Sequence, residues 1–429
     1  MPARGLGATP TRTTDRAALA CAQVVPGHRG GCPRRVTWLA ARETIGRVVG
    51  VAVVALVPWL AGCTHGPAGQ YVVPPQTSRP IPTSRSPQPV SFTLAATGDL
   101  LLHEPVTRRA KALASGHGYD FRSLLADVRP ILSVADLAIC HMETPLSRDD
   151  RRISYWPSFN APHEIAPAAR WAGYDTCTTA SNHTLDQGSD GVRATLDALD
   201  AAHLQHVGTA RSPAERSWRM YRVRGVRVAH LDYTYGLNGI PVPSGKPWLV
   251  NLIDPHRILA DAHAARRAGA QFVIVALHWG QEYQSKPTAE QRALARTLLA
   301  SPDIDLVYGC HVHVVQPVER IGGKYVVYGL GNFLARHAPC CDTPPTRDGM
   351  ILQVTVTERH GRFAVSGMRY TPTYVDAQTI VVLPVARMLR QPGLAPPLRQ
   401  ALLDSWQRTV TRVDMLGAAR LGVAPDERP

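Results

Sequence analysis

The chain has 429 residues, 45% hydrophobic and 19% charged, a length and composition that exclude both a disordered chain and a small disulfide-stapled scaffold. The formal net charge is +14, but ten arginines against two acidic residues lie within residues 1–90, and the body of the chain has no basic stripe interleaved with aromatic residues. We therefore expect a globular protein of one or two domains with no nucleic-acid partner.

The first element along the chain is an apolar stretch at 48–60, preceded by arginines. It is too short to span a bilayer comfortably and is typical of a signal-peptide core. It ends in LAGC at 60–63, which resembles the bacterial lipobox, where the cysteine becomes a diacylated N-terminus. We therefore expect 47–63 to be a lipoprotein signal peptide with lipidation at Cys63, and a lipid-anchored protein on the extracytoplasmic face of the cell membrane. The alternative is an uncleaved signal anchor.

The segments on either side of this stretch do not predict a packed core. Residues 1–46 show no helical or strand periodicity, so they are either a disordered arm or the product of a mis-assigned start. Residues 64–90 are rich in Pro, Ser, Thr and Gln, which predicts an extended tether. Export would make disulfides possible, and Cys140 with Cys177 is the candidate pair if their strands are neighbours. The alternative for these residues is a buried apolar cysteine.

From residue 91 onward the pattern alternates strands with helices, which favours an α/β sheet. The expected strands are 92–96, 137–140, 174–178, 272–277 and 304–308, and the expected helices are 121–132, 191–202, 255–268 and 288–299. Paired stretches at 218–223 with 226–231, 314–321 with 324–328, and 350–357 with 363–370 predict hairpins, and therefore a mixed sheet or a two-sheet sandwich. We expect this domain to cover 91–376, followed by a C-terminal extension at 377–429 with one helix at 398–410.

Polar residues follow the expected strands where each strand ends. The residues are Asp99 and His103, Glu143, Asn182 and His183, His278, and His311 with His313. The polar groups that follow strand ends in an α/β sheet gather at one edge. Asp, Glu, Asn and His supply the oxygen and nitrogen ligands of divalent transition metals, so this order predicts a metal-dependent site.

The order of these groups resembles that of calcineurin-like metallophosphatases, and more specifically the CapA family of poly-γ-glutamate capsule-synthesis proteins. The matching stretches are TGDLLLH at 97–103, METPLS at 142–147, 159–188, ALHWGQEY at 276–283 and 305–333. The resemblance covers about residues 92–375 and implies a metallophosphatase-like four-layer α/β/β/α sandwich with mixed sheets. The chain departs from the family pattern at His141 and Ser181, where relatives commonly carry asparagine.

The resemblance also implies residue roles. Asp99, Glu143 and His313 would form one metal site, with His103 a possible additional ligand. Glu143, Asn182, His278 and His311 would form the other, so that Glu143 bridges two divalent ions such as Mn, Fe or Zn. His183 would protonate a leaving group, and Asp186 would orient it. Glu282 and Asn332 are pocket candidates.

A dinuclear site of this kind activates water for attack on phosphoester or amide bonds. We therefore expect a membrane-anchored, CapA-like protein that makes or processes a capsule or cell-wall polymer of the poly-γ-glutamate type, as a hydrolase or transferase. The alternative is a non-catalytic subunit that binds the anionic polymer or a membrane synthase complex during assembly or export.

Overall fold

The computed structural model describes residues 89–215, 218–337 and 341–429. The expected arm at 1–46, signal peptide at 47–63 with Cys63, and nearly all of the tether at 64–90 lie outside the described residues. Within the described ranges, no helix is long and apolar enough to cross a membrane.

Nine strands form the first sheet in the described part of the chain, in the order β14-β13-β12-β1-β2-β3-β4, with β11 also paired to β1 and β15 to β13. Their bounds are β1 Ser91–Leu101, β2 Leu137–Met142, β3 Thr176–Thr178, β4 Gln205–Val207, β11 Asn332–Ala335, β12 Asp348–Arg359, β13 Arg362–Val375, β14 Val382–Pro384 and β15 Ala424–Pro425. Strands β1 to β4 are parallel, and β12 runs antiparallel to β1. The sheet is therefore mixed.

The second sheet has the order β5-β6-β7-β8-β10-β9 and is also mixed. Its strands are β5 Trp218–Val223, β6 Val226–Thr234, β7 Phe272–His278, β8 Leu306–Cys310, β9 Val318–Ile321 and β10 Lys324–Val327. Strands β6, β7, β8 and β10 are parallel, while β5 and β9 close the two edges as antiparallel hairpins.

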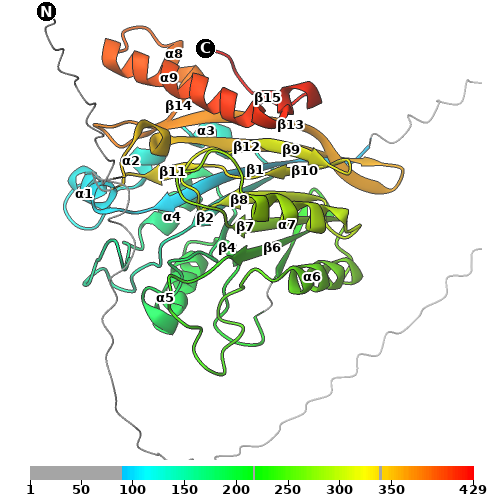
Figure 1. Cartoon of the computed structure of the whole chain (residues 1–429). Helices are drawn as coiled ribbons and strands as arrows, with labels where there is room; N and C mark the ends of the chain where they lie inside the picture. The colour runs from blue at the N-terminus through cyan, green and yellow to red at the C-terminus, as the bar shows by residue number, and fades with distance from the viewer. Residues whose placement is uncertain (1–88, 216–217, 338–340) are drawn as a thin grey trace, which may run out of the picture. The chain divides into compact units, whose positions relative to one another are not determined.

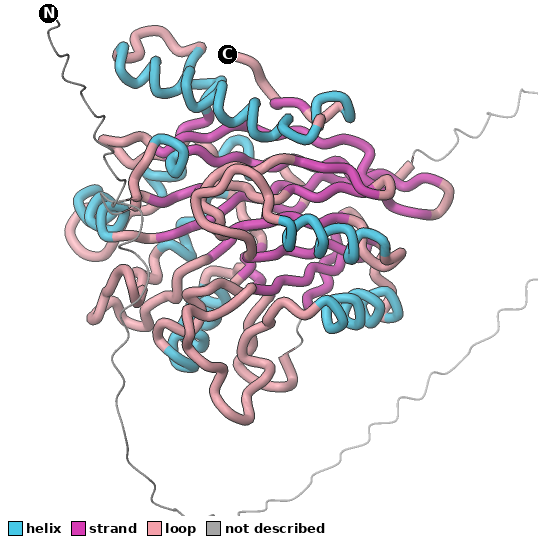
Figure 2. Tube along the Cα trace, in the orientation of Figure 1, coloured by secondary structure: helices cyan, strands magenta, loops and turns pink. Residues whose placement is uncertain are grey.

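The helices cover the outer faces of the two sheets, as Figures 1 and 2 show. The α-helices are α1 Glu104–Leu113, α2 Arg122–Leu125, α3 Arg129–Leu132, α4 Ile165–Ala172, α5 Gly188–Ala201, α6 Pro255–Arg267, α7 Ala289–Ala300, α8 Val385–Leu389 and α9 Pro396–Val413. Short 3-10 turns lie at η1 Pro344–Arg347, η2 Asp414–Leu416 and η3 Ala418–Leu421. Helices α1 to α5 pack on the first sheet and α6 and α7 on the second.

Alternating side chains explain the layers, because successive residues of a strand face opposite sides of a sheet. In β1, Leu94 and Ala96 belong to the core between the sheets, whereas Ala95 packs against the helices. In β7, Ile274 likewise faces the first sheet and Val275 faces α6 and α7. Both sheets are thus buried on two faces, and the predicted four-layer α/β/β/α sandwich is confirmed.

The predicted disulfide between Cys140 and Cys177 is present. The two cysteines are register partners on the adjacent parallel strands β2 and β3, with their Cα atoms 4.5 Å apart. The bond therefore links the two strands just before the loops that carry Glu143 and Asn182. Cys310, in β8, is a buried thiol.

Some predicted elements differ from the structure in their extent. The helix expected at 121–132 is instead two short helices, α2 and α3. Pro130 explains the break, because proline has no amide hydrogen and its ring clashes with the carbonyl of the preceding turn. The hairpin expected at 314–321 with 324–328 begins only at Val318, and its Gly322-Gly323 turn has positive φ at both residues, as a tight hairpin requires.

The C-terminal segment completes the first sheet. Its expected helix at 398–410 lies within α9, and β14 and β15 both pair with β13. The guanidinium of Arg408 in α9 donates two hydrogen bonds, of 2.7 and 2.9 Å, to the buried carboxylate of Asp348 in β12. This ion pair fixes α9 against the sheet.

Candidate metal centre

Strand ends from both sheets meet in one buried cluster of polar side chains. The first sheet supplies Asp99 in β1, Glu143 after β2, and Asn182 and His183 after β3, and the second supplies His278 at the end of β7, with His311 and His313 after β8. Each of these residues is less than a tenth exposed. The structure thus brings the seven residues together, as the order of strand ends predicts.

Glu143 lies at the centre of the cluster. Its side chain is 1% exposed, and neither carboxylate oxygen has a hydrogen-bond partner among the described residues. Its Oε1 lies 3.8 Å from His313 Nε2 and 4.0 Å from His278 Nε2. Because a buried carboxylate without a partner is unfavourable, the position suits a cation held between this oxygen and the imidazole nitrogens.

Asp99 and Asn332 orient His313. The Nδ1 atom of His313 lies 3.0 Å from Asp99 Oδ2 and 3.0 Å from Asn332 Oδ1, so this nitrogen donates and Nε2 faces Glu143. The amide nitrogen of Asn332 bonds in turn to His337 Nε2 at 3.0 Å and to the carbonyl oxygen of Thr346 at 2.8 Å. The expected pocket residue Asn332 therefore supports a predicted ligand.

Asn182 presents its oxygen to the cluster. Its Nδ2 donates to Asn238 Oδ1 at 3.2 Å, which leaves Oδ1 facing His278 Nε2 at 2.9 Å. The nearby His311 has a buried Nδ1 with no hydrogen-bond partner among the described residues. The oxygen of Asn182 and the nitrogens of His278 and His311 are therefore available as ligand atoms.

The electrostatics of the cluster follow from burial and close neighbours. Burial, followed by repulsion from Asp99, raises the pKa of Glu143 well above its usual value. Burial opposes ionisation of Asp99, but the hydrogen bond and charge of His313 outweigh it and lower the pKa of Asp99. Burial lowers the pKa of His278 and brings that of His311 to about 3, so both are neutral, as metal ligands must be. Burial also opposes protonation of His313, but Glu143 and Asp99 raise its pKa to about 10.

Two groups of side chains at this centre have ligand atoms within 4.8 Å of one another. They are Asp99, His141 and His278, and Glu143, His311 and His313. The mixed nitrogen and oxygen donors, together with the partnerless carboxylate of Glu143, are compatible with divalent metal ions. The predicted possible ligand His103 is in neither group, and its ring instead lies beside those of His337 and Phe159, with centroids 4.8 and 5.1 Å away.

His183 and Asp186 form a pair at the edge of the cluster. The Nδ1 of His183 lies 2.8 Å from Asp186 Oδ2, and the same oxygen accepts a 2.7 Å hydrogen bond from the backbone nitrogen of Phe159. Asp186 is thus held in place and fixes the ring of His183, which is the geometry expected of an oriented proton donor.

Backbone contacts hold the loops that carry these groups. A Cβ on Gly98 would lie 1.7 Å from the carbonyl oxygen of Gly331, so only glycine allows β1 to approach this loop just before Asp99. The buried carboxylate of Asp232 accepts from the backbone nitrogens of Thr179 and Ala180, at 3.0 and 2.8 Å. The hydroxyl of Ser181 then donates to the carbonyl of Glu143 at 2.6 Å. This last bond ties the loop after β3 to the loop after β2.

The sequence prediction did not identify several residues of the centre. His141 is a buried cluster member, Asn238 orients Asn182, His337 bonds Asn332, and the ring of Tyr235 lies 4.5 Å from that of His311. For His141 the signal was available, because it is one of the positions where the chain departs from the family pattern. Tyr235 directly follows β6 and His337 lies two residues after β11, but the strand expected at 226–231 stopped short of Tyr235 and β11 was not predicted. Asn238 lies in the loop after β6 and has no such signal.

Exposed side chains form the rim of the centre. Tyr235 and Tyr283 are 49% and 44% exposed, and the ring of Tyr283 lies 6.0 Å from that of His313. The expected pocket residue Glu282 is also exposed, and its negative charge contributes to the raised pKa of Glu143. The rim is thus aromatic with one acidic group.

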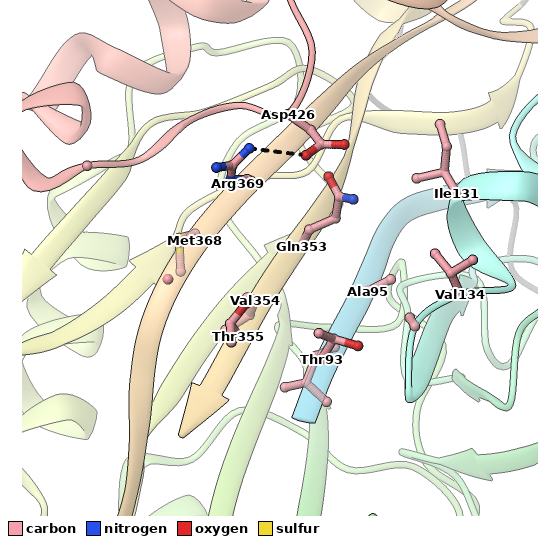
Figure 3. Close-up of a pocket in the computed structure, with 14 residues that line it drawn as sticks. Thr93, Ala95, Ile131, Val134, Gln353, Val354, Thr355, Met368, Arg369 and Asp426 are labelled. Atoms are coloured by element: carbon pink, nitrogen blue, oxygen red, sulfur yellow. Dashed lines mark ion pairs between the residues drawn. The ribbon is translucent and has the colours of Figure 1, made fainter. Parts of the chain in front are cut away.

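A separate cavity of about 420 Å³ lies on the outer face of the first sheet, over β1, β12 and β13 (Figure 3). Val134 and Ile131 line one side of it, and Arg369 and Asp426 form an ion pair of 3.5 Å on the other. No residue predicted for the metal site lines this cavity. The chemistry-bearing residues therefore gather elsewhere.

Two curated proteins of capsule or PGA biosynthesis resemble the chain in sequence. The chain is 28% identical over 253 residues to the capsule biosynthesis protein CapA of Bacillus anthracis, covering 57% of this chain and 59% of that protein. It is 27% identical over 250 residues to the PGA biosynthesis protein CapA of Bacillus subtilis, covering 57% of this chain and 64% of that protein. The chain therefore covers less than two thirds of the length of either relative.

Among solved structures, the chain is similar to the calcineurin-like phosphoesterase YfkN from Bacillus subtilis, with 14% identity, a TM-score of 0.43, and coverage of 78% of this chain and 100% of that chain. The model of the bacterial capsule synthesis protein family PGA_cap matches residues 93–337, which include all the predicted metal ligands. This match spans more than half of the sequence, and the chain belongs to the bacterial capsule synthesis protein PGA_cap family.

Proposed function

We propose that this chain is a metal-dependent accessory protein of capsule or cell-wall polymer synthesis, which acts on a polymer of the poly-γ-glutamate type at the Glu143 centre. The family and the names of its CapA relatives support the biological process. The observation that carries the chemistry is the buried carboxylate of Glu143, which has no hydrogen-bond partner among the described residues and whose Oε1 lies within 4.0 Å of imidazole nitrogens of His278 and His313.

Two divalent ions, of Mn, Fe or Zn, would be held at this centre. Asp99, Glu143 and His313 would hold one, and Glu143, Asn182, His278 and His311 the other. Such a pair, when bound, supplies a hydroxide near neutral pH and stabilises the charge that develops on a phosphoryl or carbonyl oxygen.

The protein's own residues would supply the proton. The Nδ1 of His183 is occupied by Asp186, so its other ring nitrogen is the one that donates to a leaving oxygen or amine. The aromatic rim residues Tyr235 and Tyr283 would contact the polymer on either side of the centre.

The direct test is hydrolysis by the purified full-length chain with added Mn²⁺, using bis-p-nitrophenyl phosphate and poly-γ-glutamate as substrates. We expect turnover of at least one substrate, and we expect His278→Ala to abolish it. The matched control is His263→Ala, since His263 is an exposed histidine on α6 that pairs with Asp303. Bound Mn²⁺ with no turnover of either substrate would contradict the catalytic proposal.

Complementation separates the enzyme from a non-catalytic subunit that binds the polymer or a membrane synthase. In a host lacking its own copy of the gene, an enzyme requires His278 for capsule assembly. If His278→Ala restores assembly as well as the natural chain does, the role is one of binding. The modest positive charge of the chain after residue 90 is compatible with an anionic polymer in either case.

The proposed location is the extracytoplasmic face of the cell membrane, through a lipid on Cys63. The support is the arginine-flanked apolar stretch that ends in LAGC at 60–63. Mass spectrometry of the mature protein should find a diacylated Cys63 as the first residue. A mature chain that retains residues before Cys63 would contradict this proposal.

A further inference from the structure

His141 is a buried histidine on the sheet side of the metal centre, outside the ligand set that the family resemblance implies. It is 1% exposed and sits in β2, where Asp99 of β1 and Thr178 of β3 are its register partners. Its ring lies across the seam between the sheets from His278, with centroids 4.9 Å apart. Its Nε2 lies 4.0 Å from Asp99 Oδ1 and 2.9 Å from His278 Nδ1, so His278 is its nearer contact at the centre.

A chain of short hydrogen bonds runs through His141. Its Nε2 lies 2.9 Å from His278 Nδ1, and its Nδ1 lies 2.8 Å from Thr178 Oγ1. The hydroxyl proton of Thr178 can go to His141 Nδ1, or to the carbonyl oxygen of Cys140 at 3.2 Å. These two choices set opposite directions for every proton along the chain.

Only one direction leaves His278 able to bind a cation. When Thr178 donates to the Cys140 carbonyl, it accepts from His141 Nδ1, because a carbonyl oxygen can only accept. A neutral imidazole carries one N–H, so His141 Nε2 then accepts the Nδ1 proton of His278. The Nε2 of His278 is left with its lone pair.

That lone pair points at the ligand cluster. His278 Nε2 lies 2.9 Å from Asn182 Oδ1 and 4.0 Å from Glu143 Oε1. The Oδ1 of Asn182 is fixed as an acceptor, because its Nδ2 donates to Asn238. The lone pairs of His278 Nε2, Asn182 Oδ1 and Glu143 Oε1 thus point toward one another. A cation bound between the three atoms removes this repulsion.

We propose that His141 is a positioning residue for His278: it accepts the Nδ1 proton of His278, with Thr178 and the Cys140 carbonyl setting the direction, and so presents His278 Nε2 to the metal. The inference rests on the proposed metal site and deepens it. It also gives a physical role to a residue that replaces the commoner asparagine of the family pattern.

The test is Zn²⁺ affinity of the full-length chain, measured by competition with a chelating dye. His141→Leu removes the acceptor at similar volume, and we expect Zn²⁺ affinity to fall about 10- to 100-fold, as is usual when a residue that supports a metal ligand is lost. His141→Gln places an amide oxygen near the former Nε2 and should recover most of the loss. In the Zn²⁺-bound chain, the proton NMR signal of the His278 ring N–H should be slow to exchange, and in His141→Leu it should exchange rapidly.

A matched pair of threonines on β3 provides the control. Thr178 and Thr176 are both fully buried, and Thr176 bonds to Tyr221 at 2.8 Å, away from His141. We expect Thr178→Val, which loses the bonds to His141 and to the Cys140 carbonyl, to weaken Zn²⁺ binding. Thr176→Val, which loses the bond to Tyr221, should leave Zn²⁺ binding unchanged. If His141→Leu does not fold, these two threonine variants still test whether His141 positions His278.

The outcomes separate this inference from the proposed function. Folded His141→Leu that binds Zn²⁺ as tightly as the natural chain would overturn the role of His141 alone. Equal effects of Thr178→Val and Thr176→Val would do the same. A natural chain that binds no Zn²⁺ would overturn the metal centre itself, and the role of His141 with it.

Discussion

Replacing Glu143 with glutamine should stabilise the metal-free protein and abolish its stabilisation by metal. The carboxylate is 1% exposed, and neither of its oxygens has a partner among the described residues. A buried acceptor without a partner costs about 1–3 kcal/mol, and more if it is charged. The raised pKa of Glu143 already opposes its charge in the metal-free chain, and an amide of the same shape carries no charge at any pH. Its oxygen can accept from Nε2 of His313, which the raised pKa of His313 keeps protonated. We therefore expect the free energy of unfolding of metal-free Glu143→Gln to rise by about 1–2 kcal/mol.

With metal bound, the natural chain should be more stable than Glu143→Gln. A ligand present at about 100 times its Kd stabilises the folded state by about 2.7 kcal/mol, and only the natural chain has the carboxylate to gain this. Urea unfolding with chelator and with Mn²⁺ measures both quantities for the two proteins. The control is Glu290→Gln, because Glu290 is exposed on α7, and it should change neither value appreciably. Equal stabilisation of both proteins by Mn²⁺, or a metal-free variant less stable than the natural chain, would refute the reasoning.

Three further results are expected. Arg408→Met removes two hydrogen bonds and an ion pair from the buried carboxylate of Asp348, where Ser405 and the charge of Arg412 remain, so urea unfolding should show a loss of about 3 kcal/mol. An unchanged value would contradict the role of this ion pair. Burial lowers the pKa of His230 to about 3, so as pH falls below 6.5 the unfolded chain takes up this proton first, and the contribution of His230 to stability falls by about 1.4 kcal/mol per pH unit. The acid dependence of unfolding between about pH 6.5 and 4.5 should therefore be shallower by this amount in His230→Gln than in the natural chain, and an unchanged slope would contradict the prediction. Asp186→Asn should slow hydrolysis by about 10²-fold through the loss of an oriented His183 while Mn²⁺ affinity stays the same, and a parallel loss of affinity would assign Asp186 to the metal site instead.

The sequence located the ligand residues because their positions follow a simple rule. Glu143, Asn182, His278 and His311 each end or follow a strand, and Asp99 follows the expected strand at 92–96, which in the structure is β1 and continues past it to Leu101. The ends of parallel strands coincide at one edge. The alternation of strands with helices predicted an α/β sheet and the paired stretches a mixed sheet or two-sheet sandwich, whereas the four-layer arrangement followed from the family resemblance. Local sequence pattern therefore predicted the residues at the strand ends and the alternation of strands with helices.

The residues that escaped prediction are those whose roles depend on long-range contacts. His141 lies inside a buried strand and looks like a core residue, until it meets His278, 137 positions further along the chain. Asn332 was predicted as a pocket residue, but its contact with His313 was not, because it is placed by β11, a four-residue strand that pairs with β1 and is too short for a periodic signal. The sequence marks His141 as a departure from the family pattern and Asn332 as a pocket residue, but no local pattern around either one shows its hydrogen bond across the seam between the sheets.

The apolar layer between the sheets also sets the spacing of the metal centre. Ala96 on β1 and Ala276 on β7 both belong to this layer, three residues before Asp99 and two before His278. Close-packed interiors transmit added volume to their neighbours rather than absorbing it. A larger side chain at either alanine would wedge the sheets apart at the end where the ligands meet. The small volume of these two alanines therefore sets the distance between the ligand residues of the first sheet and those of the second.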